Sequence, residues 1–165
     1  MCVYEGDTIP YVKLPTVYIF KPLKFKNRRE MAKYYKLIRD VKKVLPISKE
    51  INRAIIETYE YLQTIPTEKG RQKHLKAVEK GLKEQYTPRM KKLSFSQGKL
   101  LIKLVDRQTH STSYELVKAF MGPFKAGFYQ TFAALFGASL KKQYDPTGDD
   151  ALTERVILMV ESGQL

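Results

Sequence analysis

The sequence lacks tryptophan altogether and has only one cysteine and two histidines among its 165 residues. Cys2 alone cannot form an internal disulfide, so no disulfide framework supports the fold. His74 and His110 have no acid at a ligand-like spacing, and no glycine-rich phosphate or dinucleotide motif is present. We therefore expect neither a bound metal nor a cofactor.

Long apolar runs are also missing, because no segment has enough consecutive apolar residues to cross a bilayer. No signal peptide is visible, yet a strand-like run starts almost at Met1 without a polar lead-in. From this start we expect an in-frame upstream leader, which would place the protein in the periplasm or at the cell envelope.

Positive charge is abundant and unevenly distributed. The chain has 30 Lys and Arg against 17 Asp and Glu, which gives a formal net charge of +13. Residues 1–92 hold 22 of the basic and 10 of the acidic residues, so nearly all of the excess lies there. This asymmetry predicts an anionic partner, which is a nucleic acid, an acidic membrane surface or an acidic polymer.

The length and the 43% hydrophobic content indicate a single domain with its own core. Residues 8–20 are rich in β-branched and aromatic residues but interrupted by prolines, which predicts a short hairpin or an extended arm. The fold predicted for the whole chain is mostly α, a compact bundle of about six to seven helices after this β element. Its parts are a β arm (1–22), a basic helical part (23–92) and an apolar helical core (93–165).

Capping residues and prolines predict where each helix begins and ends. In chain order the predicted helices are Asn27 to Leu45 with Pro46 as the stop, Ser48 to Pro66, Thr67 to Pro88, Ser94 or Ser96 to about Arg107, residues 112–121, a helix from Pro123, and a last helix from Asp149–Asp150 to Gly163. The fourth to sixth are the most apolar, so we expect them at the centre.

Apolar residues at steps of three and four predict which side of each helix faces inward. The expected inward residues are Met31, Tyr34, Tyr35, Ile38, Val41 and Leu45; Ile51, Ile55, Tyr59 and Leu62; Leu75, Val78, Leu82 and Tyr86; and Leu152, Val156, Met159 and Val160.

Basic residues gather on the opposite sides of two of these predicted helices. On the third helix they recur at steps of four, three, four and three, which places them in one row: Lys69, Lys73, Lys76, Lys80 and Lys83. On the first helix the basic face consists of Arg28, Arg29, Lys33, Lys36, Arg39 and Lys43. These residues are candidates for an anion-binding surface, and an ordinary solvated helix face is the alternative.

The densest polar run, DRQTHSTS, follows directly after the aliphatic residues 100–105. Asp106, His110 and Ser113 are residue types that nucleophilic catalysis uses, so an enzyme site around Asp106 and Arg107 is one interpretation. A structural joint between two helices is the interpretation that we favour. Thr112 and Glu115 fit a capping box, Arg107 suits a helix C-terminus, and Asp106 would pair with a basic residue.

Four blocks of the sequence carry a resemblance to a known family. They are GDTIPYVKLPTVYIF (6–20), KFKNRREMAKYYKLIRDVKKVLP (24–46), LSFSQGKLLIKLVDRQTHSTSYELVK (93–118) and LFGASLKKQYDP (135–146). In order and spacing they resemble an uncharacterised bacterial family with a domain of unknown function. No activity, cofactor or catalytic residue follows from the resemblance. It does imply that similar chains often begin with an export signal.

Together these observations favour a non-enzymatic binding or interaction domain with a basic surface for an anionic partner. An enzyme around Asp106 and Arg107 is one alternative. A nucleic-acid-binding protein is another, although only the charge supports it.

Overall fold

The computed structural model describes residues 1–4, 6–10, 12, 14, 16–111 and 144–165. Its elements are β1 (Cys2–Tyr4), β2 (Asp7–Ile9), α1 (Arg28–Thr64), α2 (Glu68–Lys91), α3 (Phe95–Ser111) and α5 (Ala151–Glu161). The mostly α fold is confirmed. The count of six to seven helices is not supported, because the described residues form four helices. The helices expected at 112–121 and from Pro123 lie outside the described residues.

The first two predicted helices are in fact one, because α1 continues through Pro46. Its inward face keeps the helical phase across the proline, since Val41, Leu45 and Ser48 are all buried. Pro46 is exposed, so its ring lies away from the core, and the packing of the opposite face stabilises the helix. Ser48 is therefore no N-cap; its hydroxyl donates to the Leu45 carbonyl oxygen, 2.8 Å away.

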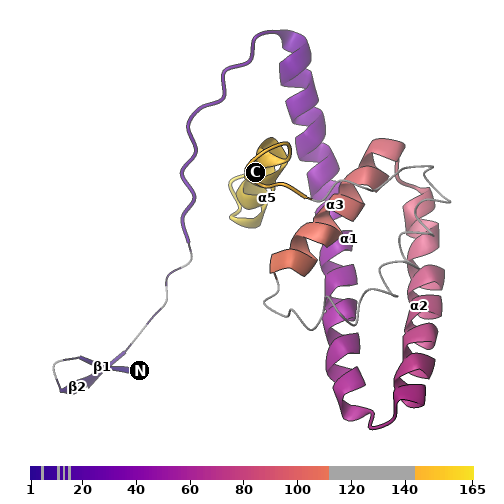
Figure 1. Ribbon diagram of the computed structural model, residues 1–165. Helices are drawn as coiled ribbons and strands as arrows, with labels where there is room; N and C mark the ends of the chain where they lie inside the picture. The colour runs from indigo at the N-terminus through magenta and orange to yellow at the C-terminus, as the bar shows by residue number, and fades with distance from the viewer. Residues whose placement is uncertain (5, 11, 13, 15, 112–143) are drawn as a thin grey trace.

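α2 runs back alongside the second half of α1 (Figure 1). Thr67 caps its N-terminus as predicted, because the Thr67 hydroxyl accepts a hydrogen bond from the Gly70 N–H at 3.2 Å. Pro88 does not end α2 as predicted. Its side chain is exposed, and the helix continues to Lys91. The side that faces α1 buries Leu82, Tyr86 and Met90, which follow one another at steps of four.

α3 occupies the centre, as predicted for the fourth helix, and packs across α1 (Figure 1). It buries Leu100, Leu101, Ile102, Leu104 and Val105 in the main core. Its start is a capping box. The Ser94 hydroxyl accepts from the Gln97 N–H at 3.3 Å, and the Gln97 side-chain oxygen accepts from the Ser94 N–H at 3.1 Å.

Three predicted inward residues are exposed instead: Met31, Tyr35 and Leu152. The first turns of α1, which include Met31 and Tyr35, extend beyond α3, so α3 does not cover them (Figure 1). On α5 the fully buried pair is Val156 and Ile157, and only the first was expected.

The hairpin lies earlier than predicted, and the described residues of the second half of 8–20 form the extended arm that was its alternative. β1 and β2 pair antiparallel, with Cys2 opposite Ile9, whereas residues 16–27 form no strand. This segment runs past α5 to the start of α1 (Figure 1). It touches α5 where the Arg155 guanidinium lies 5.0 Å from the centre of the Phe20 ring, and it touches the residues after α5 where the Gln164 side-chain amide donates to the Tyr18 carbonyl oxygen at 3.0 Å.

Candidate functional site

The basic row predicted on the third helix lies on α2, opposite the face that packs on α1. Its five members are Lys69, Lys73, Lys76, Lys80 and Lys83, and all five are exposed. Thr87 and Lys91 continue the row at two further steps of four. We call Lys69, Lys73, Lys76, Lys80, Lys83 and Lys91 the lysine stripe. Lys91 was not part of the predicted row, because Pro88 was expected to end the helix, whereas α2 continues to Lys91.

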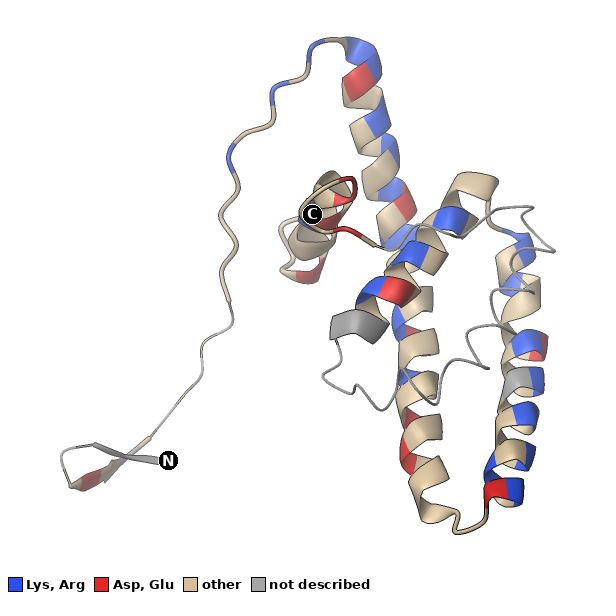
Figure 2. Cartoon of the chain, in the orientation of Figure 1, with Lys and Arg blue, Asp and Glu red and all other residues tan. Residues whose placement is uncertain are grey.

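The lysine stripe carries little neutralising charge. Among the described side chains, Lys80 is the stripe's one member with an ion pair, a 3.9 Å contact with Glu84 in which both side chains are largely exposed. An exposed pair of this kind contributes little to stability. Figure 2 shows Lys and Arg along the outer side of α2. Within the described side chains, the stripe is therefore a surface of positive charge with one weak acidic partner.

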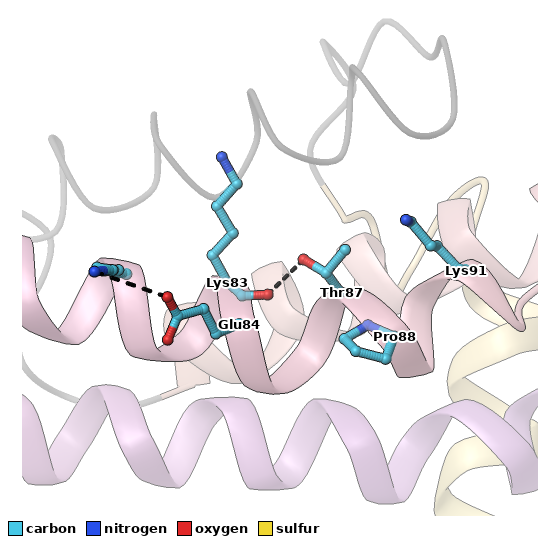
Figure 3. Close-up of a pocket in the computed structure, with 6 residues that line it drawn as sticks. Lys83, Glu84, Thr87, Pro88 and Lys91 are labelled. Carbon is cyan, nitrogen blue, oxygen red and sulfur yellow. Dashed lines mark hydrogen bonds and ion pairs between the residues drawn. The ribbon is translucent and has the colours of Figure 1, made fainter.

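A shallow hollow borders the C-terminal half of the stripe. Its lining consists of Lys80, Lys83, Glu84, Thr87, Pro88 and Lys91. Figure 3 shows the side chains of Lys83 and Lys91 extending from the same side of α2. The Thr87 hydroxyl already donates to the Lys83 carbonyl oxygen, so the lysine ammonium groups are the donors that the hollow offers to a ligand.

The basic face predicted on the first helix contains residues with different surroundings. Arg28, Arg29 and Arg39 are exposed, as expected of an anion-binding face. Lys36 and Lys43 instead hold the start of α3. The Lys36 ammonium group lies 2.6 Å from the Asp40 carboxylate and 3.0 Å from the Ser96 hydroxyl, and that of Lys43 lies 3.1 Å from the Gln97 side-chain oxygen.

The two basic faces meet end to end rather than side by side. Arg89, near the end of α2, pairs with Glu50 of α1, and the Lys43 ammonium group lies 3.5 Å from the Lys92 carbonyl oxygen. The stripe thus runs beside the second half of α1, whereas Arg28, Arg29 and Arg39 lie on its first half (Figure 2).

The joint of α1 and α3 centres on Asp40 and Gln97, which sequence analysis did not single out. The Gln97 side-chain amide donates to Asp40 at 2.8 Å while its oxygen accepts from Lys43. Burial raises the pKa of Asp40, but the hydrogen bonds from Lys36 and Gln97 and the charges of Lys36 and Arg39 outweigh it and lower the pKa below its ordinary value. Asp40 was detectable as an acid on an otherwise basic face.

The polar run around Asp106 is part of α3, which continues past Arg107 to Ser111. Asp106 is buried and accepts a hydrogen bond from the Tyr144 N–H at 3.0 Å. Arg107 makes two 2.6 Å hydrogen bonds to the Glu154 carboxylate of α5. Thr112, Ser113 and Glu115 lie outside the described residues, as does the side chain of His110.

A network of charges surrounds the Arg107–Glu154 pair. The Tyr144 hydroxyl donates to Glu154 at 2.6 Å, Lys103 pairs with the buried Asp150, and Glu161 lies between Arg107 and Lys49. Burial and the Glu154 carboxylate raise the pKa of Tyr144, whose hydroxyl therefore stays protonated. The contacts of Lys103 and Arg107 connect α3 to α5 and its N-cap Asp150, and the Lys49–Glu161 pair connects α1 to α5.

The acidic loop before α5 is held by its own backbone. The Asp145 carboxylate accepts from the Thr147 and Gly148 N–H groups at 3.2 and 2.9 Å, which lowers its pKa. Among the described residues, no three His, Cys, Asp or Glu side chains are placed to hold a metal ion. No described helix has the length and apolar character needed to cross a membrane.

Comparison with curated proteins and with solved structures finds no match to this chain. A family model does match, and it covers residues 7–159, which include the extended N-terminal segment, the lysine stripe and the α3–α5 joint. This match spans nearly the whole chain, and the protein therefore belongs to the family described as "Domain of unknown function (DUF4294)".

Proposed function

We propose that this chain is a non-enzymatic binding domain whose lysine stripe takes a polyanion with charges repeated along its length. The observation that carries the proposal is the row of exposed lysines on α2, of which Lys80 alone is paired within the described residues. From Lys69 to Lys91 the row spans about 33 Å at 1.5 Å per residue. A single linear partner lying along the helix would contact all of it.

The side-chain chemistry supports recognition of charge rather than of shape or sequence. Lysine is a point charge on a flexible stem, which suits phosphate or carboxylate groups without fixing their orientation. None of the large apolar side chains that the described residues expose lies on α2, so neither base stacking nor insertion into a bilayer is supported at this face. A phosphate polymer, with nucleic acid as one member of the class, fits best.

The enzyme alternative has no comparable support. Arg107, Glu154 and Tyr144 are engaged with one another, and Asp106 accepts a hydrogen bond from backbone. A catalytic acid or base needs a group free to exchange a proton with substrate, and the described polar groups of this cluster are engaged with one another.

The test is binding of inorganic polyphosphate and of a short DNA duplex at low salt. We expect the K73Q/K76Q/K80Q variant to lose affinity at least tenfold at an unchanged melting temperature, because these lysines are solvated. K21Q/K24Q/K26Q removes the same charge from exposed positions outside the stripe and is the matched control. Equal losses in both variants, or a wild-type protein that binds neither probe, would contradict the proposal.

A further inference from the structure

The extended segment before α1 presents apolar side chains to solvent. Val17 is 78% and Ile19 is 92% exposed, whereas Tyr18 and Phe20, which alternate with them, are partly buried. Gln164 and Arg155 of the C-terminal region hold Tyr18 and Phe20 in place. Since successive side chains of an extended chain point to opposite sides, this anchorage fixes Val17 and Ile19 outward.

Positive charge follows directly after these apolar residues. The exposed basic residues of the next stretch are Lys21, Lys24, Lys26, Arg28 and Arg29. Between Pro10 and Asp40 the sequence has a single acid, Glu30, and its carboxylate accepts a hydrogen bond from the Lys26 N–H at 2.7 Å. The segment therefore has nearly unopposed positive charge beside exposed hydrocarbon.

The first turns of α1 repeat this mixture. Met31 is 39% exposed and Tyr35 is 55% exposed. Arg28, Met31, Tyr35 and Arg39 follow one another at steps of three, four and four, so they lie on one face of the helix. This face differs from the lysine stripe, which lies on a helix without a large exposed apolar side chain among its described residues. The two basic surfaces are therefore suited to different partners.

We propose that the segment from Val17 to Arg39 binds the surface of an anionic membrane. Its apolar side chains, Val17 and Ile19 first, would enter the interface, while its lysines and arginines contact the lipid headgroups. The strength of such binding increases with the apolar area that enters the interface and with the attraction between basic residues and anionic lipids. A second copy of the chain fits less well, because each copy carries a net charge of +13.

The first test is sedimentation with vesicles of phosphatidylcholine alone or mixed with phosphatidylglycerol. We expect the full chain to bind only the anionic vesicles. V17S/I19S should lower the partition coefficient at least tenfold, and K21Q/K24Q/K26Q should lower it by about fivefold per lysine. The charge-matched variant K73Q/K76Q/K80Q should bind within threefold of the wild type. This result would also show that the membrane-binding segment is distinct from the lysine stripe on α2.

The second test uses the absence of tryptophan from the sequence. In I19W the single indole should shift its emission to the blue and become shielded from iodide when anionic vesicles are added. A77W places the same reporter on an exposed position of α2 and should show neither change.

Three results would overturn the proposal. They are a wild-type chain that ignores anionic vesicles, a V17S/I19S variant that binds them as well as the wild type, and equal losses in the two lysine variants. A dimer in sedimentation that V17S/I19S dissociates would also overturn it, because the apolar residues would then contact a second copy.

Discussion

At the scale of single residues, two glycines have opposite surroundings. A Cβ at Gly148 would overlap the Asp145 carboxylate, which is held in place by the N–H groups of Thr147 and Gly148. A Cβ at Gly81 on α2 would meet no atom within 4 Å. The acidic loop therefore requires its glycine, whereas the helix only tolerates one.

These surroundings predict opposite effects of alanine on stability. Gly81→Ala should stabilise the protein by about 0.5–1 kcal/mol, because alanine loses less conformational freedom in a helix. Gly148→Ala should lower the melting temperature, because the Asp145 side chain must leave its backbone donors. Thermal unfolding of both variants checks the pair. A stabilising Gly148→Ala would show that the Asp145 turn contributes nothing to stability.

At the scale of elements, the joint of α3 and α5 depends on Arg107 and Glu154, whose side chains are each 18% exposed. Arg107→Met or Glu154→Met alone should cost about 2–3 kcal/mol, since each leaves a poorly solvated charge behind. The double variant should be less destabilised than the sum of the two by at least about 1 kcal/mol. Urea unfolding of the four proteins measures this coupling.

The exposed pair Lys80–Glu84 on α2 is the control for that cycle. Its coupling should lie within about 0.5 kcal/mol of zero, because solvent screens an exposed ion pair. A coupling as small as this between Arg107 and Glu154 would contradict the structural role of the α3–α5 joint.

The same joint makes stability depend on acid. Burial raises the pKa of Glu154, but the hydrogen bonds from Arg107 and Tyr144 and the Arg107 charge lower it below the ordinary value of 4.5. Because the folded-state pKa lies below the unfolded one, the stabilisation is complete above about pH 4.5 and is lost as the pH falls through the folded value. Glu154→Gln should therefore flatten the acid limb of the unfolding free energy. An unchanged limb in pH-dependent urea titrations would assign the acid sensitivity to other carboxylates.

The helices could be predicted from the sequence as far as local signals reach. The Thr67 cap, the start of α3 and the inward faces of α1 and α2 follow from spacing and capping. Treating Pro46 as a stop divided α1 into two predicted helices, although the apolar phase that continues through it is a stronger signal than one missing N–H. The exposure of Met31 and Tyr35 was not predictable, since it depends on where α3 crosses α1.

The candidate site, like the helices, could be predicted only in part. The lysine stripe follows from helical geometry alone, so its exposed row was predictable. The use of Lys36 and Lys43 to hold α3 was not, because their partners lie some fifty to sixty residues further along the chain. The same holds for Arg107, whose partner Glu154 belongs to a helix that only the fold brings near.

At the scale of the whole molecule, the two basic surfaces are separated in space. The extended N-terminal segment lies on the α5 side of α1, and the lysine stripe lies on the other side, along α2 (Figure 2). One surface combines cations with exposed apolar side chains, and the other has cations alone. A chain attached to a bilayer by the first would keep the second free for a polyanion, and the two contacts would not compete.

The central proposal is that a polyanion binds along the lysine stripe, and the salt dependence of that binding tests it most directly. The slope of log affinity against log salt for a DNA duplex counts the phosphates neutralised, at about −0.9 for each. We expect K73Q/K76Q/K80Q to make the slope less steep by roughly 3, one unit for each lost contact, and K21Q/K24Q/K26Q to leave it unchanged. A slope that does not change in the stripe variant, or that changes equally in both, would contradict binding along α2.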